Sequence, residues 1–214
     1  MSGCIAGCQY IPSVEYFAHW HHHGHLILEH EEHYQKRTWR NKTAIQSTAL
    51  PLSLTVPLRK GKNQQIPITE VTIAYDTPWQ KNHLHSLKTA YGRTAFFEEL
   101  LPGLEQLYSV PYDTLWKLNL DFIQFITTFL QGAWTYEFTT DFLQQYDDTV
   151  IDLRQGVGCG ISRGQSISIP EYPQVQRIHK THQSNLCILD ALCHLGPETT
   201  GFLSRYGGKL YEKP

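Results

Sequence analysis

The 214-residue sequence contains no apolar run that approaches the roughly 18–20 residues needed to span a bilayer. It also lacks an excess of basic residues, with 18 Lys and Arg against 20 Asp and Glu and a formal net charge of −2. Proteins that bind nucleic acid usually carry a strongly basic face. We therefore expect neither membrane insertion nor a nucleic-acid partner.

Disulfide patterns, secretory signals and standard nucleotide-binding loops are missing as well. The cysteines form neither a C-x-x-C pair nor a regularly spaced set, so we expect free, mostly buried thiols. They are Cys4, Cys8, Cys159, Cys187 and Cys193. The first 17 residues lack a basic stretch followed by a long apolar one, which favours a cytoplasmic location. There is no G-x-G-x-x-G or G-x-x-x-x-G-K-S/T pattern.

A strand, a helix and a second strand are expected at the start of the chain. Residues 4–8 are small and apolar, which is typical of a buried strand. Ser13 is a suitable N-cap for a helix over 14–22, and Gly24 is a suitable residue to end it. Residues 25–29 then form the next strand. A strand, helix and strand of this total length are typical of a parallel crossover.

The rest of the chain changes from strand-like to helix-like spacing of its apolar residues. Residues 52–58 and 66–73 are expected to form an antiparallel pair of strands or a strand extension. Two or three helices are expected between 83 and 130, with the last over 113–130. Strands over 134–138 and 149–153 follow, and then a helix that begins at Ser184 or Asn185 and ends before Gly196. The glycine-rich stretch 154–173 is the best candidate for a lid.

These elements predict one α/β domain over 1–214 with a mixed or mainly parallel sheet. Residues 1–80, with the strand–helix–strand unit, form the mainly α/β portion, and residues 81–214 form a mainly helical portion. A chain of this length buries enough apolar surface to fold without disulfides or a structural metal.

Histidine is unusually frequent near the start of the sequence. Seven of the 12 histidines fall within the first 33 residues, at His19, His21, His22, His23, His25, His30 and His33. Imidazoles four residues apart on a helix can share a metal ion. Gly24 interrupts that spacing, and no third and fourth ligand follow at fixed intervals. We therefore favour a solvated surface over a native metal site.

Residues 34–42, YQKRTWRNK, place four cations around an indole. Arginine binds phosphate bidentately and tryptophan stacks on rings, so this pattern suits a local anion site. A solvated basic loop is the alternative. Gln9 and Tyr10 follow the first strand, at the end of a parallel strand where α/β sheets usually bind ligands.

Two further histidine settings have ordinary structural explanations. His83 and His85 can act as a base or can cap and pack a helix, and the residues alone do not choose between these roles. A thiol mechanism with Cys187 or Cys193, His194 and Asp190 is disfavoured, because these cysteines lie in a helix with buried spacing.

The sequence resembles the WbqC-like family of small bacterial proteins over nearly its whole length. The family opens with a Q-P-x-Y-x-P-like turn and an aromatic Y-F pair, similar to Gln9, Tyr10, Pro12, Tyr16 and Phe17. Its E-x-Y-Q-K-Q-T-Y-R-N-R signature resembles residues 32–42. Later motifs resemble Trp79, His83, Ala90, Tyr91, Leu115, Asn119, Asp152, Leu153, Arg154 and residues 185–198. The sequence departs from the family at Ala95, Gln176 and His194, in place of Pro, Phe and Asn.

The resemblance implies enzymes that modify sugars of surface polysaccharides such as O-antigen, by adding an aminoacyl or acyl group to an amino sugar. It implies a substrate site made of Gln9, Tyr10, Lys36, Arg37, Trp39, Arg40, Asn41, Tyr91, Asn119 and Arg154. Lys36, Arg37 and Arg40 would hold phosphate. Trp39 and Tyr10 would stack on a ring, and His83 would act as the catalytic base toward the amine.

The leading hypothesis is a transferase that acts on a nucleotide-linked or otherwise phosphorylated amino sugar. The alternatives are a nucleotidyltransferase-like enzyme and a sugar- or partner-binding module without catalysis. The expected partner is a small molecule, either a sugar or a nucleotide sugar. The sequence predicts no particular cofactor and no oligomeric state.

Overall fold

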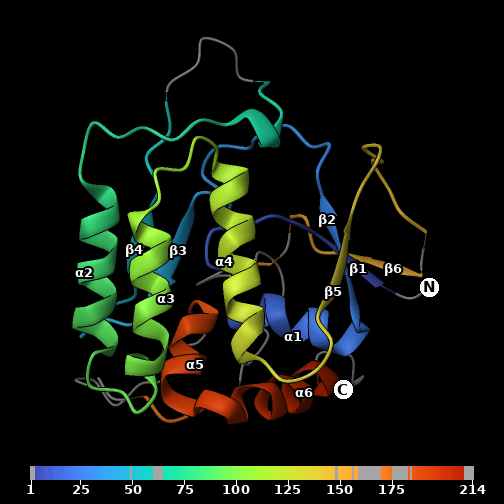
Figure 1. Cartoon of the computed structure of the whole chain (residues 1–214). Helices are drawn as coiled ribbons and strands as arrows, with labels where there is room; N and C mark the ends of the chain where they lie inside the picture. The colour runs from blue at the N-terminus through green and yellow to red at the C-terminus, as the bar shows by residue number, and fades with distance from the viewer. Residues whose placement is uncertain are drawn as a thin grey trace.

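Figure 1 shows a computed structural model in which a small sheet lies beside upright helices, with two further helices across one end. The structure describes residues 3–48, 50–59, 65–147, 149–155, 157–158, 170–174, 183 and 185–209. The predicted lid over 154–173 lies mostly outside these residues.

The predicted strand–helix–strand unit is confirmed, with β1 over Gly3–Gly7, α1 over Val14–His23 and β2 over His25–Glu29. The Ser13 hydroxyl accepts a hydrogen bond from the backbone N–H of Tyr16 at 3.3 Å, as an N-cap does. Gly24 ends the helix at φ 71°, a left-handed conformation that favours glycine.

The sheet is completed by two strands from the second half of the chain, β5 over Thr135–Phe138 and β6 over Val150–Asp152. Its order is β5-β2-β1-β6, and all three pairings are parallel. Every residue of the central strand β1 is buried, as expected where a parallel sheet is covered on both faces. The fold is thus of the predicted α/β class with a mainly parallel sheet.

The parallel arrangement of the strands brings three chain segments together at one edge of the sheet. Because β1, β2 and β6 run in the same direction, the segments that follow them emerge at one edge of the sheet. The three segments begin at Cys8, His30 and Leu153.

The predicted antiparallel pairing of 52–58 with 66–73 is found only as an isolated bridge between Leu58 and Ile73. Strand β4, Leu52–Thr55, pairs antiparallel with β3, Lys42–Ile45, which the sequence did not suggest. The segment 66–73 instead contains a 3-10 turn over Ile68–Glu70, and its backbone bonds the chain around Glu32. Pro67 cannot donate to a strand ladder and starts this turn, which explains the difference.

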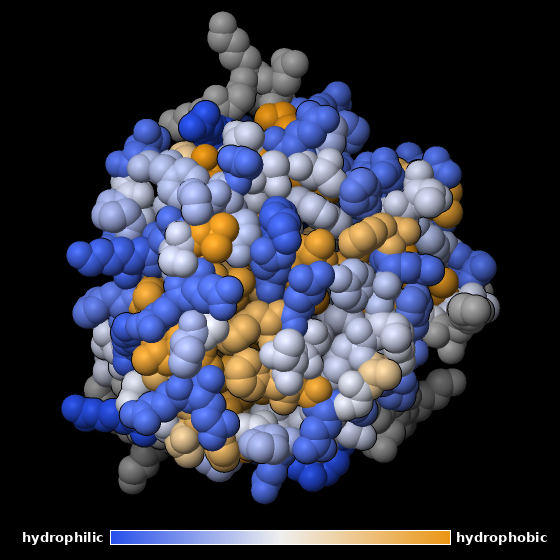
Figure 2. Space-filling view, in the orientation of Figure 1, coloured by the Kyte–Doolittle hydropathy of each residue, from blue (hydrophilic) through white to orange (hydrophobic). Residues whose placement is uncertain are grey.

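Three helices occupy the region where two or three were expected. They are α2 over Trp79–Tyr91, α3 over Phe97–Ser109 and α4 over Leu115–Phe129. Figure 2 shows apolar surface gathered over the lower parts of α3 and α4 on an otherwise largely hydrophilic face.

The C-terminal region holds one helix more than predicted. Helix α5 covers Ile188–Leu195, a shorter range than expected, and α6 covers Thr199–Lys209. The glycines of α6 weaken its sequence signal, yet Gly207 lets it approach α1 closely, since a Cβ there would lie 2.9 Å from the Ala18 carbonyl oxygen. No described helix is long and apolar enough to cross a membrane.

Candidate functional site

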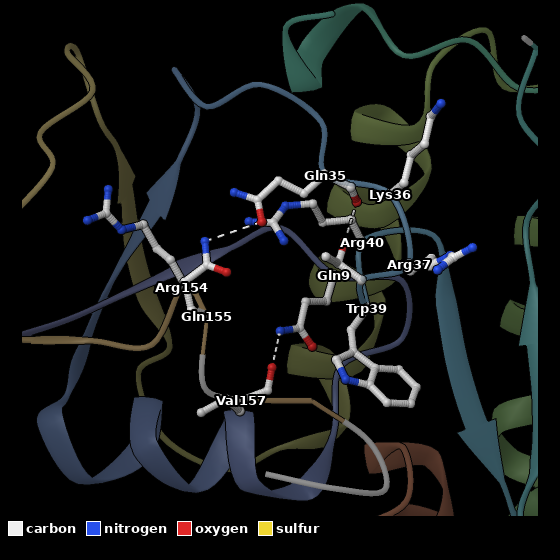
Figure 3. A pocket seen from close by; sticks show the side chains of 10 residues that line it. Gln9, Gln35, Lys36, Arg37, Trp39, Arg40, Arg154, Gln155 and Val157 are labelled. Atoms are coloured by element: carbon white, nitrogen blue, oxygen red, sulfur yellow. Dashed lines mark hydrogen bonds between the residues drawn. The ribbon is translucent and has the colours of Figure 1, made fainter. Parts of the chain in front are cut away.

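A cavity of about 360 Å³ opens at the carboxyl edge of the parallel sheet. Its walls come from the segments that follow β1, β2 and β6 (Figure 3). The lining residues are Gln9, Gln35, Lys36, Arg37, Thr38, Trp39, Arg40, Arg154, Gln155 and Val157. Six of the eleven residues predicted for the site therefore line one cavity, and the basic-aromatic segment 34–42 supplies six of its ten lining residues.

Helix α4 holds two of these walls together through Asn119. Its side-chain amide donates hydrogen bonds to the Cys8 carbonyl at 3.1 Å and to the Arg40 carbonyl at 2.8 Å. The backbone N–H of Tyr10 also donates to the Trp39 carbonyl at 3.2 Å. Asn119 is fully buried and does not line the cavity, so its predicted contact with substrate finds no support in its position.

Backbone strain is found beside the cavity. Ile11, two residues after Gln9, has φ 44°, and Arg37 in the wall has φ 63°. Residues other than glycine rarely adopt such angles, least of all β-branched ones, and strain of this kind concentrates at functional sites.

Arg40 is buried yet keeps one edge of its guanidinium open. Its Nε donates to Glu32 Oε1 at 2.6 Å and its Nη2 donates to Glu32 Oε2, and both side chains are almost fully buried. Gly7 leaves room for this pair, because a Cβ there would lie 3.1 Å from both Arg40 Nη2 and Glu32 Oε1. No residue that the structure describes accepts a hydrogen bond from Nη1 of Arg40.

Arg154, the other buried arginine of the wall, has a fully used guanidinium. Its Nε and Nη2 donate to Asp152, Nη1 donates to Glu29 at 2.9 Å, and the remaining N–H groups donate to the backbone carbonyls of Leu143 and Gln144. The hydrogen bonds with Asp152 raise the pKa of Arg154 further. Figure 3 shows its guanidinium pointing away from the other lining residues. Arg154 thus ties β6 to β2.

The remaining side chains of the basic-aromatic segment form the rim of the cavity and one of its walls. Lys36 and Arg37 are exposed and extend from the rim, away from Gln9 (Figure 3). The Lys42 ammonium lies 4.4 Å from the centre of the Trp39 ring. Gly158 packs directly against the indole, since a Cβ there would lie 1.7 Å from Trp39 Cδ1.

Tyr10 and His83 lie outside the cavity, in a buried cluster with Tyr108. The Tyr10 hydroxyl is 3.0 Å from His83 Nδ1 and 2.5 Å from the Tyr108 hydroxyl. Burial lowers the pKa of His83 to about 4, and a hydrogen bond with the Thr55 backbone opposes that shift. The catalytic role of His83 remains a prediction, but the structure does not bring His83 to the residues that line the cavity.

Asn41 and Tyr91 also lie outside the cavity, where they fix loops. Asn41 donates to the Val56 carbonyl at 2.9 Å and accepts from the Tyr34 hydroxyl at 3.1 Å. Tyr91 is buried, and its hydroxyl accepts from the Gln46 backbone N–H at 3.0 Å. Their predicted contact with substrate therefore finds no support in their positions.

The histidine-rich start and the cysteines form no site among the described residues. No group of three or more His, Cys, Asp or Glu side chains in that part of the chain is arranged to hold a metal ion. His19 is buried on α1, which lowers its pKa to about 4. Four cysteines, all buried, are free thiols, and Cys159 lies outside the described residues.

Sequence reasoning missed the groups that define the cavity's chemistry. Glu32 was part of the family signature but was not recognised as the partner of Arg40, eight residues later. Thr38, Gln35 and Gln155 also line the cavity, and Gln155 donates to Gln35 at 3.3 Å across it. The glutamates that precede the basic run, at 29, 31 and 32, were the available signal for the buried pair.

Comparisons with known proteins agree with the resemblance noted in the sequence. The model of the WbqC-like protein family matches residues 8–162. The uncharacterized protein Rv1507c of Mycobacterium tuberculosis is 30% identical over 141 residues, which is 62% of this chain and 60% of that protein. The match thus spans less than two thirds of the mycobacterial protein. No solved structure matches the chain significantly.

Proposed function

Because this chain belongs to the WbqC-like protein family, we propose that its cavity binds a phosphorylated or nucleotide-linked sugar as the substrate of a transferase. The observation that carries the proposal is the open Nη1 edge of Arg40 at a cavity on the carboxyl edge of a parallel sheet. A guanidinium edge that faces a cavity and has no acceptor among the described residues favours an anionic ligand that can bond it.

The other lining residues fit the same ligand. Lys36 and Arg37 add positive charge at the rim, where neither has an anionic partner among the described residues. The Trp39 indole offers a surface against which a sugar or a base can pack. Because Glu32 neutralises Arg40, and Asp152 with Glu29 neutralises Arg154, the remaining positive charge of the cavity comes from the rim.

The reaction itself rests on the family resemblance. In the proposed transfer, the amine of the sugar attacks the carbonyl carbon of an acyl or aminoacyl donor. A C–N bond forms, the donor's leaving group departs with the bonding electrons, and the amine loses a proton. The described lining residues would bind and orient the sugar phosphate for this step.

Calorimetric titration tests the binding. We expect a nucleotide sugar and a sugar 1-phosphate to bind, and the double variant Lys36→Ala/Arg37→Ala to weaken both about tenfold or more through lost charge–phosphate contacts. Lys88→Ala is the matched control, because Lys88 pairs with Glu105 on the helical side of the molecule.

Two results would contradict the proposal. One is the absence of binding by every phosphorylated sugar in the titration. The other is equal binding by the wild type and the double variant. Mass spectrometry of an amino sugar nucleotide incubated with activated acyl donors then separates transfer, seen as a mass gain on the sugar, from binding alone.

A further inference from the structure

Gln9 lines the cavity, and its side chain holds a hydrogen-bond acceptor that no described residue uses. Gln9 is 5% exposed, and its Nε2 donates to the Val157 carbonyl oxygen at 2.7 Å. Its Oε1 is buried and has no hydrogen-bond donor in the part of the chain that the structure describes. Figure 3 shows this amide between Val157 and the Trp39 indole.

The orientation of the amide follows from its bond with Val157. A carbonyl oxygen accepts hydrogen bonds and cannot donate, so the NH₂ group of Gln9 must face it. Turning the amide over would place two acceptor oxygens 2.7 Å apart. The acceptor of Gln9 is therefore held on the side of the amide away from Val157, toward the Trp39 indole (Figure 3).

Nearby donors are also open. The indole N–H of Trp39 donates to no residue within the described ranges, and neither does Nη1 of Arg40. The dianionic phosphate group of a sugar phosphate can accept from these donors, but it carries no hydrogen to give to Gln9. Buried acceptors are rarely left without a donor, so the cavity is incomplete when it holds phosphate alone.

We propose that Gln9 is a specificity-determining residue that accepts a hydrogen bond from an O–H or N–H group of the sugar, beside the phosphate bound by Arg40. This inference rests on the proposed function and adds to it. The ligand must carry a hydroxyl or an amide N–H within reach of its anionic group. Gln9 selects such a ligand over phosphate or pyrophosphate.

Titrations with matched variants test the role of Gln9. The probes are inorganic phosphate, pyrophosphate, glucose 1-phosphate and N-acetylglucosamine 1-phosphate. Gln9→Met keeps the size of the side chain and removes its amide. We expect it to weaken the two sugar phosphates about tenfold and to leave pyrophosphate within twofold. Gln80→Met is the control, because Gln80 makes the same kind of bond, from Nε2 to the Val110 carbonyl at 2.7 Å, outside the cavity.

Changes in the ligand give a test that needs no variant and remains valid if Gln9→Met does not fold. On the wild-type protein, at least one monodeoxy glucose 1-phosphate should bind about tenfold more weakly than glucose 1-phosphate. If N-acetylglucosamine 1-phosphate alone binds tightly, the donor is the amide N–H. If both sugar phosphates bind equally, it is a shared hydroxyl.

The failures are distinguishable. If sugar phosphates bind but neither Gln9→Met nor any deoxy analogue changes affinity, this inference is wrong and the proposed function stands. Equal weakening of pyrophosphate and sugar phosphates in Gln9→Met would make Gln9 a structural residue only. If no probe binds the wild type, the proposed function and this inference both fall.

Discussion

Gln9 and Tyr10 are neighbours in sequence, but their side chains belong to two regions with opposite polar chemistry. Gln9 enters the cavity, where its own acceptor and an edge of Arg40 have no partner among the described residues. Tyr10 enters the cluster with His83 and Tyr108, where each polar atom faces another. In the sequence, both regions contain residues that can bind a substrate or transfer a proton. The cavity combines this unused hydrogen-bonding capacity with space for a ligand.

The same contrast separates the two buried arginines. Arg40 gives two of its three nitrogens to Glu32, while Arg154 uses all three on side chains and carbonyls. Buried polar groups with complete partners hold a fold together, and those with missing partners await a ligand or cost free energy. The following predictions test this division, from the largest expected effect to the smallest.

Removing the partner of Arg40 should have the largest effect. In Glu32→Ala the buried guanidinium loses its carboxylate, so we expect the free energy of unfolding to fall by about 3–5 kcal/mol. Urea denaturation measures this. Glu105→Ala removes the carboxylate of an exposed pair with Lys88 and should cost about 1 kcal/mol or less. Equal losses in the two variants would show that the Arg40 pair is not the buried element described.

Acid should destabilise the Tyr10–His83–Tyr108 cluster. The pKa of His83 is about 4 in the folded chain against 6.5 when exposed, so the unfolded chain binds the proton more readily. The contribution of His83 to stability is complete above pH 6.5 and is lost as the pH falls through 4, by roughly 3 kcal/mol. His19, with a similar pKa, adds to the same decrease in the free energy of unfolding as the pH falls.

The variant His83→Gln isolates this contribution because it keeps polar groups and does not titrate. Its free energy of unfolding should fall less steeply than that of the wild type between pH 6.5 and 4, by urea denaturation at each pH. Parallel curves for the two proteins would place the acid sensitivity elsewhere.

Local signals predicted the first unit of the fold well. Ser13 and Gly24 mark the ends of α1, and the small residues of β1 indicate a central strand. The pairing of β4 could not be predicted, because register depends on which distant strand is adjacent and Lys42–Ile45 carries no clear alternation. Helix α6 was missed because its glycines give little helix propensity, while packing against α1 stabilises it.

The candidate site was also predictable only in part, because local sequence signals do not show which side chains pair in the folded chain. The composition of the basic-aromatic segment predicts an anion site. The position of Gln9 after the first strand predicts that Gln9 lies at the edge of the sheet where ligands bind. Which cations are already neutralised depends on contacts such as Arg40 with Glu32 and Arg154 with Glu29. His83 could be placed on a helix from sequence, but its burial against Tyr10 follows from tertiary packing.

A methyl group at Gly158 should disturb the cavity and leave the buried cluster intact. In Gly158→Ala the new Cβ would overlap Trp39, so the indole or the wall must move, at a cost of about 1–3 kcal/mol. Because the Trp39 indole lines the cavity, this movement should also lower the affinity for glucose 1-phosphate. Gly201→Ala, on α6 with nothing within 4 Å of the new atom, should be neutral or slightly stabilising. Unchanged affinity in Gly158→Ala would remove Trp39 from the binding surface.

The smallest effect is expected from the arginine that has no free edge. In Arg40→Lys the charge remains but the open Nη1 edge is lost, so sugar phosphate affinity should fall about tenfold. In Arg154→Lys the same change breaks the tie between β6 and β2 and lowers the melting temperature, while affinity stays within twofold because no N–H of Arg154 was available to the ligand. Titration of both variants, with melting curves as the control for folding, compares them directly. If Arg154→Lys loses as much affinity as Arg40→Lys, then Arg154 gives up some of its hydrogen bonds within the protein when the ligand binds. A complete set of partners in the free protein would then not distinguish a structural arginine from one that binds ligand.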